Sequence, residues 1–347
     1  MNFEKYKDKG LSGLSNLGNT CFINSCIQLL SHTYELNDFL DLETYKNKLN
    51  NKYDSALLIQ WDELRKILWN ENCIVSPNKF VNTVQKIAQI KGMEIFTGFS
   101  QNDLPEFLLF VIDCFHNSIL REVDITISGI PKNDTDTIAL KCFEMVKRMY
   151  TKEYSEIWNL FYGVHVSQII SNKEDQNKVL SVNPEPFFMV NLSIPENNKS
   201  PNLYDCFDLY VKGEMLEGEN AWYNEETKEK ENVKKQISFW SFPNILAIDL
   251  KRFNSSQRKK QILVNFPIEN LDLSKYVIGY KSETFVYDLY GIANHSGGVL
   301  GGHYTAFVKN ANGKWYHFND TLVNEIKNVN ELITPKAYCL LYRKRKT

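Results

Sequence analysis

The sequence predicts an α+β fold, with helices early in the chain and strands later. In the first half, apolar residues recur at helical spacing, whereas in the second half they alternate as in half-buried strands. The chain has 347 residues, of which 43% are hydrophobic, so it can build a large core. This length fits either two domains or one large enzyme domain.

Helices are expected in the first half at residues 22–31, 55–69, 77–90 and 102–119. Ser76 and Pro77 match an N-cap followed by proline at the first helical position. Asn102 or Asp103 is the expected cap of the last of these helices, which has Pro105 in its first turn.

Strand periodicity follows in the second half, at residues 187–194, 245–251, 284–293, 304–309, 314–319 and 337–343. Residues 183–188 (NPEPFF) are expected to form a turn that leads into the first of these strands. The polar run ETKEKENVKK at residues 226–235 is expected to be a solvated connection or an exposed hairpin, with no specific binding role.

Charge and composition argue against several classes of partner. The formal net charge is −2, so no overall basic field attracts nucleic acid or anionic lipid. The N-terminal segment lacks the apolar region of a signal peptide, and no run approaches the length of a membrane span. We therefore expect an intracellular protein, cytoplasmic or nuclear, with no nucleic-acid or membrane partner.

The seven cysteines are odd in number and irregularly spaced, and no two form a Cys-x-x-Cys pair. This argues against a disulfide framework and a four-cysteine zinc site, and we expect no metal or cofactor. Cys21 differs from the others because it follows Gly18 and Asn19 and opens an apolar helix, where unpaired N–H groups stabilise a thiolate. Cys21 is therefore the candidate nucleophile, and the alternative is a small core residue.

His303 is the candidate base because a hairpin pattern surrounds it. Two glycines precede it, a strand follows, the Asn-Gly pair at 312–313 predicts a turn, and a second strand ends at Asn319 and Asp320. A loop centred on Ala311 places His303 opposite Asn319, which supplies the orienting group that a Cys–His pair requires. The alternative is an ordinary hairpin with solvated polar ends. Three other histidines are expected to be surface or satisfied core residues: His32, His116 and His317.

With these residues in place, the chain resembles the ubiquitin-specific protease family. GLSNLGNTCFINSCIQLL (13–30) resembles its Cys box, and residues 287–320 with 337–343 resemble its His box. Residues 96–113 are similar to the family's Gln-Asp segment. Other segments recur in family order, at 154–163, 185–194, 242–253 and 264–276. The resemblance spans residues 11–343, and several separated motifs in the right order make it specific.

The resemblance implies a papain-like cysteine peptidase with a helical thumb, a mixed palm and β fingers. It also implies one catalytic domain over residues 1–347, with its core at 11–343. Such enzymes cleave the isopeptide bond after the C-terminal Gly-Gly of ubiquitin, in a cleft between thumb and palm. The expected partners are ubiquitin and ubiquitinated proteins, and the enzyme is expected to be a monomer.

Motif positions imply a role for each site residue. Cys21 would be the nucleophile, His303 the general base and acid, and Asn16 the oxyanion-hole asparagine. Asn319 would be the third residue that orients the imidazole, with Asp320 able to share or take over that role. An asparagine can accept the imidazole N–H but adds no charge.

The substrate tail also has expected contacts. Asp103 and Glu106 match family positions that contact the arginine-rich tail of ubiquitin, and they lie three residues apart on one helix face. The alternative for Asp103 is capping of the helix N-terminus. His295 and Tyr304 match residues that line the narrow groove for Gly-Gly.

The chain departs from the family pattern in three places. Residues 167–176 and 220–230 lack the cysteines that bind zinc in many members, so no structural zinc is expected. Residues 101–103 read Gln-Asn-Asp where Gln-Gln-Asp is more usual. Residues 122–150 match no family motif and are interpreted as an insertion with a helix near 138–150.

Three alternative functions remain open. The chain could be a non-catalytic ubiquitin-binding scaffold, although it retains Cys21, His303 and Asn319. It could be another Cys–His enzyme, such as a transglutaminase-like acyltransferase or a general papain-like protease, although the intervening motifs argue against this. It could also cleave a different ubiquitin-like modifier.

Overall fold

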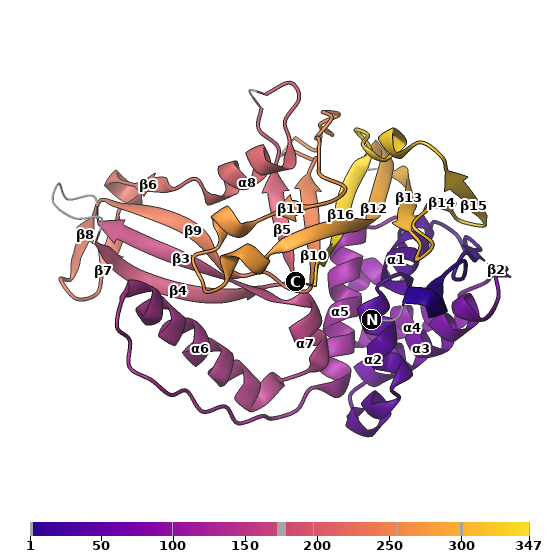
Figure 1. Cartoon of the computed structure of the whole chain (residues 1–347), viewed down its shortest axis with the longest axis horizontal. Coiled ribbons are helices and arrows are strands. Elements are labelled where there is room, and N and C mark those ends of the chain that lie inside the picture. The colour runs from indigo at the N-terminus through magenta and orange to yellow at the C-terminus, as the bar shows by residue number, and fades with distance from the viewer. Residues whose placement is uncertain are drawn as a thin grey trace.

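The computed structural model describes residues 3–98, 100–171, 178–196, 198–254, 256–298 and 301–346. Helices from the first third of the chain form one end of the molecule, and strands form its centre and its other end (Figure 1). We call these parts the thumb, the palm and the fingers. The predicted α+β arrangement is confirmed.

The thumb is a bundle made of α1 (Cys21–Ser31), α2 (Tyr34–Asp41), α3 (Asp54–Asn70), α4 (Asn78–Ile90) and α5 (Leu104–Ile119). Every residue of α1 is buried, because this helix packs against α5 on one side and against the palm on the other. Apolar side chains dominate this enclosed helix, and its buried polar residues include Asn24 and Gln28, which form hydrogen bonds to other segments. The helix that begins at Cys21 therefore lies at the boundary between thumb and palm.

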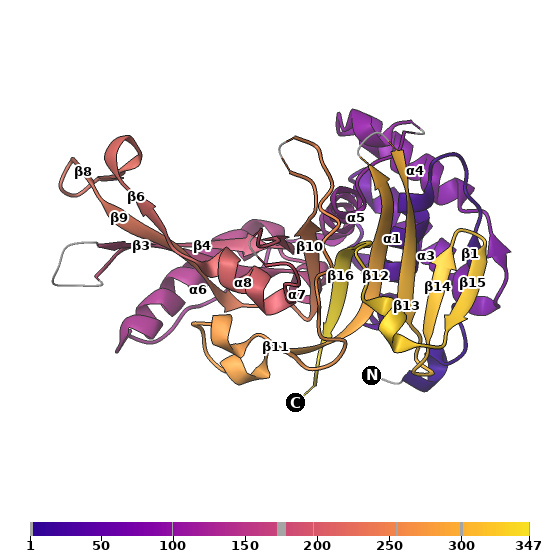
Figure 2. The same ribbon diagram turned by 90° about the horizontal axis from the view of Figure 1, so that it is seen from above.

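The palm is a sheet with strands in the order β15 (Leu322–Ile326), β14 (Trp315–Asn319), β13 (Gly301–Lys309), β12 (Val286–Gly298), β16 (Ala337–Lys344), β10 (Ile245–Lys251) and β5 (Met189–Ser193). A short strand, β11 (Leu271–Asp272), also pairs with β12. β5 and β10 are parallel, whereas β12, β13 and β14 form antiparallel pairs. Figure 2 shows the palm strands crossing in front of the thumb helices.

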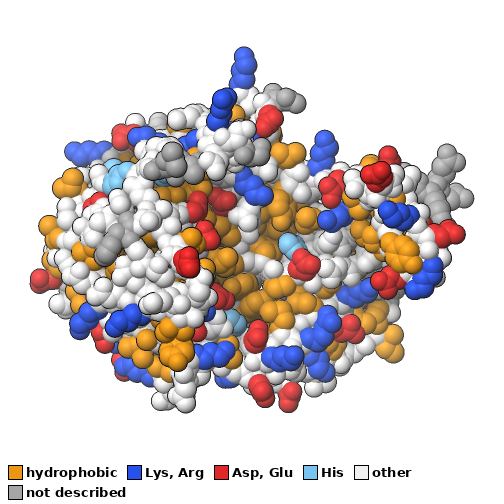
Figure 3. Space-filling model, turned by 180° about the vertical axis from the view of Figure 1, so that it is seen from behind, with side chains coloured by type: hydrophobic (Ala, Val, Ile, Leu, Met, Phe, Trp, Pro, Cys, Tyr) orange, Lys and Arg blue, Asp and Glu red, His pale blue; other side chains and the backbone are white. Residues whose placement is uncertain are grey.

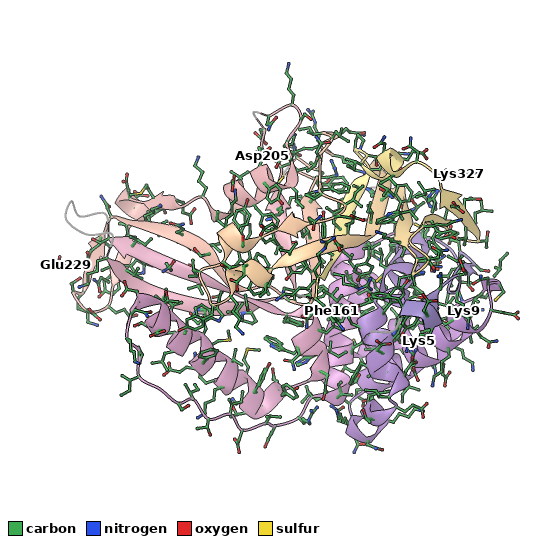
Figure 4. The ribbon with its side chains drawn as sticks, viewed as in Figure 1. Lys5, Lys9, Phe161, Asp205, Glu229 and Lys327 are labelled. Atoms are coloured by element: carbon green, nitrogen blue, oxygen red, sulfur yellow. The ribbon has the colours of Figure 1, made fainter. Side chains whose placement is uncertain are left out.

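The fingers are a second sheet, in the order β4 (Val179–Phe187), β3 (Gly163–Ser171), β9 (Val233–Ser241) and β6 (Glu214–Leu216). A hairpin of β7 (Trp222–Asn224) and β8 (Glu229–Glu231) extends the far end of this arm. α6 (Asp134–Glu153) packs along β4. Figure 4 shows Glu229 at the tip of the arm and Phe161 near the middle of the molecule.

Shorter elements connect these parts. They are α7 (Glu156–Phe161), α8 (Leu203–Val211), and the parallel pair β1 (Gly13–Leu14) and β2 (Ile74–Val75). Single 3₁₀ turns occur at Phe3–Tyr6, Thr44–Lys48, Glu94–Phe96, Gly218–Asn220, Ser274–Tyr276, Ser282–Thr284 and Val329–Leu332.

Both faces of the palm are buried in its centre, at β10 and β16. On β10, Ile245 and Ala247 belong to the core shared with the thumb, whereas Leu246 and Ile248 belong to a second core on the opposite face. Side chains alternate along a strand, so Asp249 lies on the same face as Ile245 and Ala247. A carboxylate therefore lies on the thumb side of β10, next to the apolar residues Ile245 and Ala247.

The predicted helices of the first half are confirmed to within a few residues, but one predicted cap is wrong. Pro77, not Ser76, occupies the position before α4, and the Ser76 hydroxyl donates to Ser15 at 3.0 Å instead. The helix expected near 138–150 is longer than predicted. Of residues 226–235, those up to Glu231 belong to the β7–β8 hairpin, whereas Val233 is buried and begins β9.

The turn predicted at residues 183–188 is wrong. β4 continues through Pro184 and Pro186, which face Val166 and Val164 of β3. β4 is the edge strand of the described sheet, and proline is tolerated there because outward N–H groups need no partner. The predicted strand 187–194 is therefore divided between β4 and β5.

Candidate active site

Cys21 is the first residue of α1 and is only 2% exposed. Its sulfur accepts a hydrogen bond from the backbone N–H of Tyr304 at 3.5 Å, which brings β13 against the start of α1. Burial raises the pKa of the Cys21 thiol, and the N–H groups of Tyr304 and Phe22 lower it. The net shift is upward, opposite to the lowered pKa expected from the helix terminus alone.

His303 lies beside Asn319, as predicted, but in a different register. His303 Nε2 is 2.7 Å from Asn319 Oδ1. Ala306 pairs with Phe318, so the same register puts Thr321 opposite His303 and makes Asn319 a diagonal neighbour. The predicted register is wrong by two residues, and an even shift keeps both side chains on one face of the sheet.

Asp320 binds residues on both sides of Cys21, not the imidazole. Its carboxylate accepts hydrogen bonds from Asn16 Nδ2 at 3.0 Å and from Asn24 Nδ2 at 2.8 Å. Its carbonyl accepts from the N–H of Leu14 at 2.8 Å. Asp320 has φ of 49°, a left-handed conformation that turns its side chain away from the direction of Asn319.

Asn16 also organises the turn that precedes the cysteine. Its Oδ1 accepts hydrogen bonds from the N–H groups of Gly18 at 3.0 Å and Thr20 at 3.2 Å. Gly18 has φ of 104°, which explains why a glycine is needed there. The Asn16 amide is therefore fixed from both ends, by the turn and by Asp320.

His295 and Tyr304 lie directly opposite each other on β12 and β13, with ring centroids 4.6 Å apart. Burial, followed by the nearby Lys259 ammonium, lowers the pKa of His295 to about 4. Gly302 lies under this imidazole, because a Cβ added there would be 2.3 Å from His295 Nε2. Only glycine fits this position.

Gln101 joins the thumb to the palm at the same place. Its Nε2 donates to the carbonyl of Gly302 at 2.7 Å, and its Oε1 accepts from the N–H of Gly302 at 2.5 Å. The segment before α5 and the start of β13 are therefore bonded to each other beside His303.

A groove of about 500 Å³ lies between the thumb, the palm and the base of the fingers. Its lining includes apolar rings and three acidic residues, Asp103, Glu106 and Asp249. Asp103 is the N-cap residue of α5, and its carboxylate accepts a hydrogen bond from the Tyr338 hydroxyl at 2.6 Å. Glu106 is exposed. Hydrophobic side chains gather in a hollow between the fingers and the rest of the molecule (Figure 3).

Two carboxylates in this groove are poorly solvated. Burial raises the pKa of Asp103. Burial, followed by the negative charge of Asp103, raises the pKa of Asp249 to about 7. The Oδ1 atom of Asp249 is buried without a hydrogen-bond partner. The groove therefore favours a cationic group, which would relieve the repulsion between the two acids.

Within the described residues, no group of three or more His, Cys, Asp and Glu side chains is arranged to hold a metal ion. The segment 172–177, part of which was considered for zinc, lies outside the described residues. All seven cysteines are free thiols. No helix in the described part of the chain has the length and apolar character needed to cross a membrane.

A sequence model described as ubiquitin carboxyl-terminal hydrolase matches residues 12–342. The chain belongs to the ubiquitin carboxyl-terminal hydrolase family. The matched range includes the segment at 122–150, which sequence motifs alone did not connect to the family.

The curated relatives of this family member are longer than the chain. Ubiquitin carboxyl-terminal hydrolase 2 of Bos taurus is 32% identical over 348 residues, which are 96% of this chain and 55% of the relative. Ubiquitin carboxyl-terminal hydrolase 21 of Mus musculus is 31% identical over 363 residues, covering 96% of this chain and 62% of the relative. The chain thus spans about half the length of the curated relatives it matches.

The fold is similar to that of the SAGA Ubp8/Sgf11/Sus1/Sgf73 DUB module, solved bound to ubiquitin aldehyde. This similarity has a TM-score of 0.74 at 25% identity and covers 99% of this chain and 71% of that chain. A structure of the module bound to monoubiquitin also gives 0.74, at 24% identity, and covers 100% and 71%. The predicted papain-like fold of the family is confirmed.

Sequence reasoning missed several residues of this family member's site. Asp249 could have been found, because it is the single charged residue within the apolar run ILAIDL. Gln101 belongs to the Gln-Asn-Asp segment at 101–103, but its two bonds to Gly302 have no signal in the sequence. Asn24 and Lys259 carry no local signal, since each acquires its contact from a segment far away in the sequence.

Proposed function

We propose that the chain is a cysteine-type deubiquitinase that hydrolyses isopeptide bonds after the C-terminal glycine of ubiquitin. The observation that carries this proposal is the position of His303 on β13: it is bonded to Asn319 of β14, and the N–H of the next residue, Tyr304, contacts the Cys21 sulfur. A thiol, an imidazole and an orienting amide are the groups that acyl transfer by a cysteine peptidase requires.

The proposed reaction has two steps. His303 takes the proton of the Cys21 thiol, the sulfur attacks the glycine carbonyl, and the C–N bond breaks as His303 protonates the leaving lysine amine. This leaves a thioester. His303 then removes a proton from water, the hydroxide attacks the thioester, and Cys21 regains its proton as the ubiquitin carboxylate leaves.

Asn16 is proposed to stabilise the oxyanion that forms in each step. Its amide nitrogen has two hydrogens, of which one is bonded to Asp320, so the other can donate to the oxyanion. A donor of this kind lowers the barrier by about 3–4 kcal/mol. Asp320 and Asn24 would serve as positioning residues, because they fix the direction of the Asn16 amide.

Asn319 is proposed to be the third catalytic residue, with Asp320 excluded from direct contact with the imidazole. Asn319 Oδ1 accepts the Nε2–H of His303, which leaves Nδ1 as the nitrogen that exchanges protons with Cys21. Asp320 acts on the other side of the site, through its bond to Asn16.

The groove is proposed to bind the C-terminal tail of ubiquitin. Asp103, Glu106 and Asp249 would contact its arginines, because each carboxylate lines the same groove. His295 and Tyr304, which pair across β12 and β13 beside Gly302, would enclose the terminal Gly-Gly.

The test is hydrolysis of ubiquitin carrying a C-terminal fluorophore. The chain should release the fluorophore, and Cys21→Ala should abolish release while keeping affinity for ubiquitin. Cys73→Ala is the matched control, because Cys73 is a half-buried thiol outside the site, and it should retain full activity. Undiminished turnover by Cys21→Ala would contradict the proposal.

A second candidate is a ubiquitin-binding scaffold, which the raised pKa of Cys21 favours because a thiol that stays protonated is a weak nucleophile. Tight binding of ubiquitin without turnover, at any pH up to about 9, would support this candidate. Specificity for another ubiquitin-like modifier would be detected with the same fluorogenic assay on that modifier.

We also propose that residues 1–347 form one catalytic domain that acts as a monomer inside the cell, in the cytoplasm or nucleus. The continuous family match over residues 12–342 supports one domain. Light scattering and fluorescence imaging of the tagged protein test the other two points.

A further inference from the structure

A second cavity, which we call the basic pocket, lies away from the candidate active site. It has a volume of about 530 Å³, and its walls come from residues 3, 34–35, 288–290, 309–311, 313 and 343–346. This volume is within the range of about 300–1,000 Å³ that small-molecule sites occupy. β13 runs from His303 near one end to Lys309 at the other, so the two sites lie at opposite ends of one strand.

Arg343 forms one wall of the basic pocket and is held in place on all sides. Its guanidinium carbon is 4.7 Å from the ring centroid of Tyr34 and 4.5 Å from that of Tyr290. Its Nε donates to Glu35 Oε1 at 2.6 Å, and its Nη2 donates to the carbonyl of His32 at 2.9 Å. Among the described residues, Nη1 has no hydrogen-bond partner. The pocket therefore has a fixed guanidinium with an unused donor.

Arg345 presents a second guanidinium to the same pocket. Its Nε donates to Asp288 Oδ2 at 2.7 Å, while the other carboxylate oxygen accepts from the N–H of Asn270 at 3.0 Å. Neither Nη atom of Arg345 has a partner in the described part of the chain. The exposed Lys346 follows, and no carboxylate of the described residues lies within ion-pair distance of it. Two guanidiniums and one ammonium thus retain unused donors here.

The charge of the pocket lining is positive. Lys309 and Lys344 direct their ammonium groups elsewhere, to Glu269 at 3.3 Å and to the Thr284 hydroxyl at 3.3 Å, but they still add to the positive field. Both acidic residues of the lining already bind arginines. The lining has five basic and two acidic residues, namely Lys309, Arg343, Lys344, Arg345 and Lys346 against Glu35 and Asp288.

An apolar ring lies beside these cations. Phe3, in the 3₁₀ turn at Phe3–Tyr6, lines the pocket with 42% of its surface exposed. Its ring meets Tyr34 edge to face, with centroids 5.7 Å apart. Figures 1 and 2 show the two chain ends near each other, which is how Phe3 comes to face the basic residues at the end of β16. A flat apolar group can therefore pack here while an attached anion reaches the arginines.

We propose that the basic pocket binds a small organic phosphate with a flat apolar body. The phosphate oxygens accept from the free Nη groups of Arg343 and Arg345 and from the Lys346 ammonium, because guanidinium forks match phosphate geometry. The body packs against Phe3. The ligand is a small molecule, since several separate segments bound the cavity, whereas a peptide needs an extended groove.

The experiment measures binding of 1-naphthyl phosphate to the full chain by isothermal titration calorimetry. Three further ligands separate its parts: inorganic phosphate lacks the body, 1-naphthol lacks the charge, and 1-naphthoate carries a carboxylate instead. The double variant Arg345→Gln/Lys346→Gln removes charge. Ala311→Phe narrows the pocket and leaves every charge in place, because Ala311 lines it. Lys79→Gln/Lys86→Gln is the matched control, since both lysines are exposed on α4.

The wild type should bind 1-naphthyl phosphate with a Kd of about 100 μM, and the three other ligands at least about tenfold more weakly. The double variant and Ala311→Phe should each weaken binding of 1-naphthyl phosphate by about tenfold or more, the loss expected for about one charge-assisted hydrogen bond or for a filled pocket. The Lys79→Gln/Lys86→Gln control should match the wild type.

Four results would overturn the inference. The first is no binding of 1-naphthyl phosphate to the wild type up to about 5 mM. The second is equal affinity for inorganic phosphate, which would show an adventitious ion only. The third is tighter binding of 1-naphthoate, and the fourth is unchanged affinity in both pocket variants. The first three need no variant, so they do not depend on how a variant folds. None measures hydrolysis, so the outcome is independent of the proposed function.

Discussion

The side-chain amide of Asn16 donates a hydrogen bond to the carboxylate of Asp320 at 3.0 Å, across 304 residues of sequence. This bond joins the turn before the candidate nucleophile to the end of the hairpin that carries the candidate base. Asn24, one turn into α1, donates to the other oxygen of the same carboxylate. The two halves of the site are thus connected through a residue that touches neither the sulfur nor the imidazole.

Asp320→Asn should lower kcat by about tenfold to a hundredfold with little change in KM. The substitution keeps the shape of the side chain but turns one acceptor toward the amides of Asn16 and Asn24 into a donor. Steady-state kinetics on the ubiquitin–fluorophore substrate measure the effect. Asp288→Asn, which breaks a surface pair with Arg345, is the control, and equal activity of both variants would contradict the role of Asp320.

Asn319→Ala should lower kcat by about tenfold or more, because the imidazole of His303 loses the acceptor at 2.7 Å that fixes its orientation. Asn319→Asp should stay within about threefold of the wild type, since a carboxylate oxygen can occupy the same place and accept the same N–H. The comparison of the two kcat values is the measurement. An Asn319→Asp variant as impaired as Asn319→Ala would contradict this role, because it would show that an acceptor at position 319 is not enough to support catalysis by His303.

Alkylation of Cys21 by iodoacetamide in the free protein should accelerate as pH rises through about 9, because only the thiolate reacts. Burial raises the pKa of this thiol above its ordinary value of 9.0, so the thiolate fraction is still growing there. Mass spectrometry of the Cys21 peptide at a series of pH values gives the rate. A rate that is already constant below about pH 7 would indicate a preformed thiolate and would contradict this expectation.

Asp249→Asn should stabilise the fold at high pH. The pKa of Asp249 is raised to about 7, above the ordinary value of 3.8, so the stability that its protonated form contributes is complete below about pH 4 and lost as pH rises through about 7. The variant cannot ionise, and its free energy of unfolding should exceed that of the wild type by roughly 2–4 kcal/mol at about pH 8 and by little at about pH 4.

Urea unfolding of Asp249→Asn at the two pH values measures this difference, and kinetics test its proposed role. If the Asp249 carboxylate attracts the cationic tail of the substrate, the KM of Asp249→Asn should be about fivefold higher than that of the wild type, although the variant is more stable. A stabilised variant with unchanged KM would remove Asp249 from the proposed substrate contacts.

Gly302→Ala should abolish activity, because its Cβ would meet His295 Nε2 at 2.3 Å and backbone oxygen at 2.6 Å. Gly298→Ala is a matched control on the neighbouring strand, since a Cβ there has nothing within 4 Å, and it should retain activity within about twofold. The same fluorogenic assay compares the two. Equal activities would mean that the backbone at Gly302 can move away without consequence.

The fold class and most elements could be predicted because periodicity and apolar runs report burial directly. β10 was predicted with its observed bounds because it is buried on both faces and flanked by polar residues. β4 was missed because its prolines resemble a turn, although an edge strand tolerates them. β9 and β3 carry many polar residues, since the fingers expose much of their surface, and they gave no strand signal of their own.

The candidate site was predictable in composition but less so in geometry. The proximity of His303 and Asn319 is confirmed, but their register depends on the loop, which is centred on Asn312 instead of Ala311. The contact of Asp320 with Asn16 could not be deduced, because it depends on a left-handed backbone at Asp320. Contacts such as Lys259 with His295 depend on the packing of distant segments, which no local pattern encodes.

The position of β16 in the palm has a consequence for biosynthesis. This strand comes after all the other palm strands in the chain, yet it lies between β12 and β10 and pairs with both. While the ribosome is still making the protein, Cys21 and His303 both emerge before the strand that completes the sheet behind them. A nascent chain that has not reached residues 337–344 therefore leaves the edges of β10 and β12 that pair with β16 open, and open edges can pair with other chains. The candidate site can therefore be completed only after translation has passed this strand.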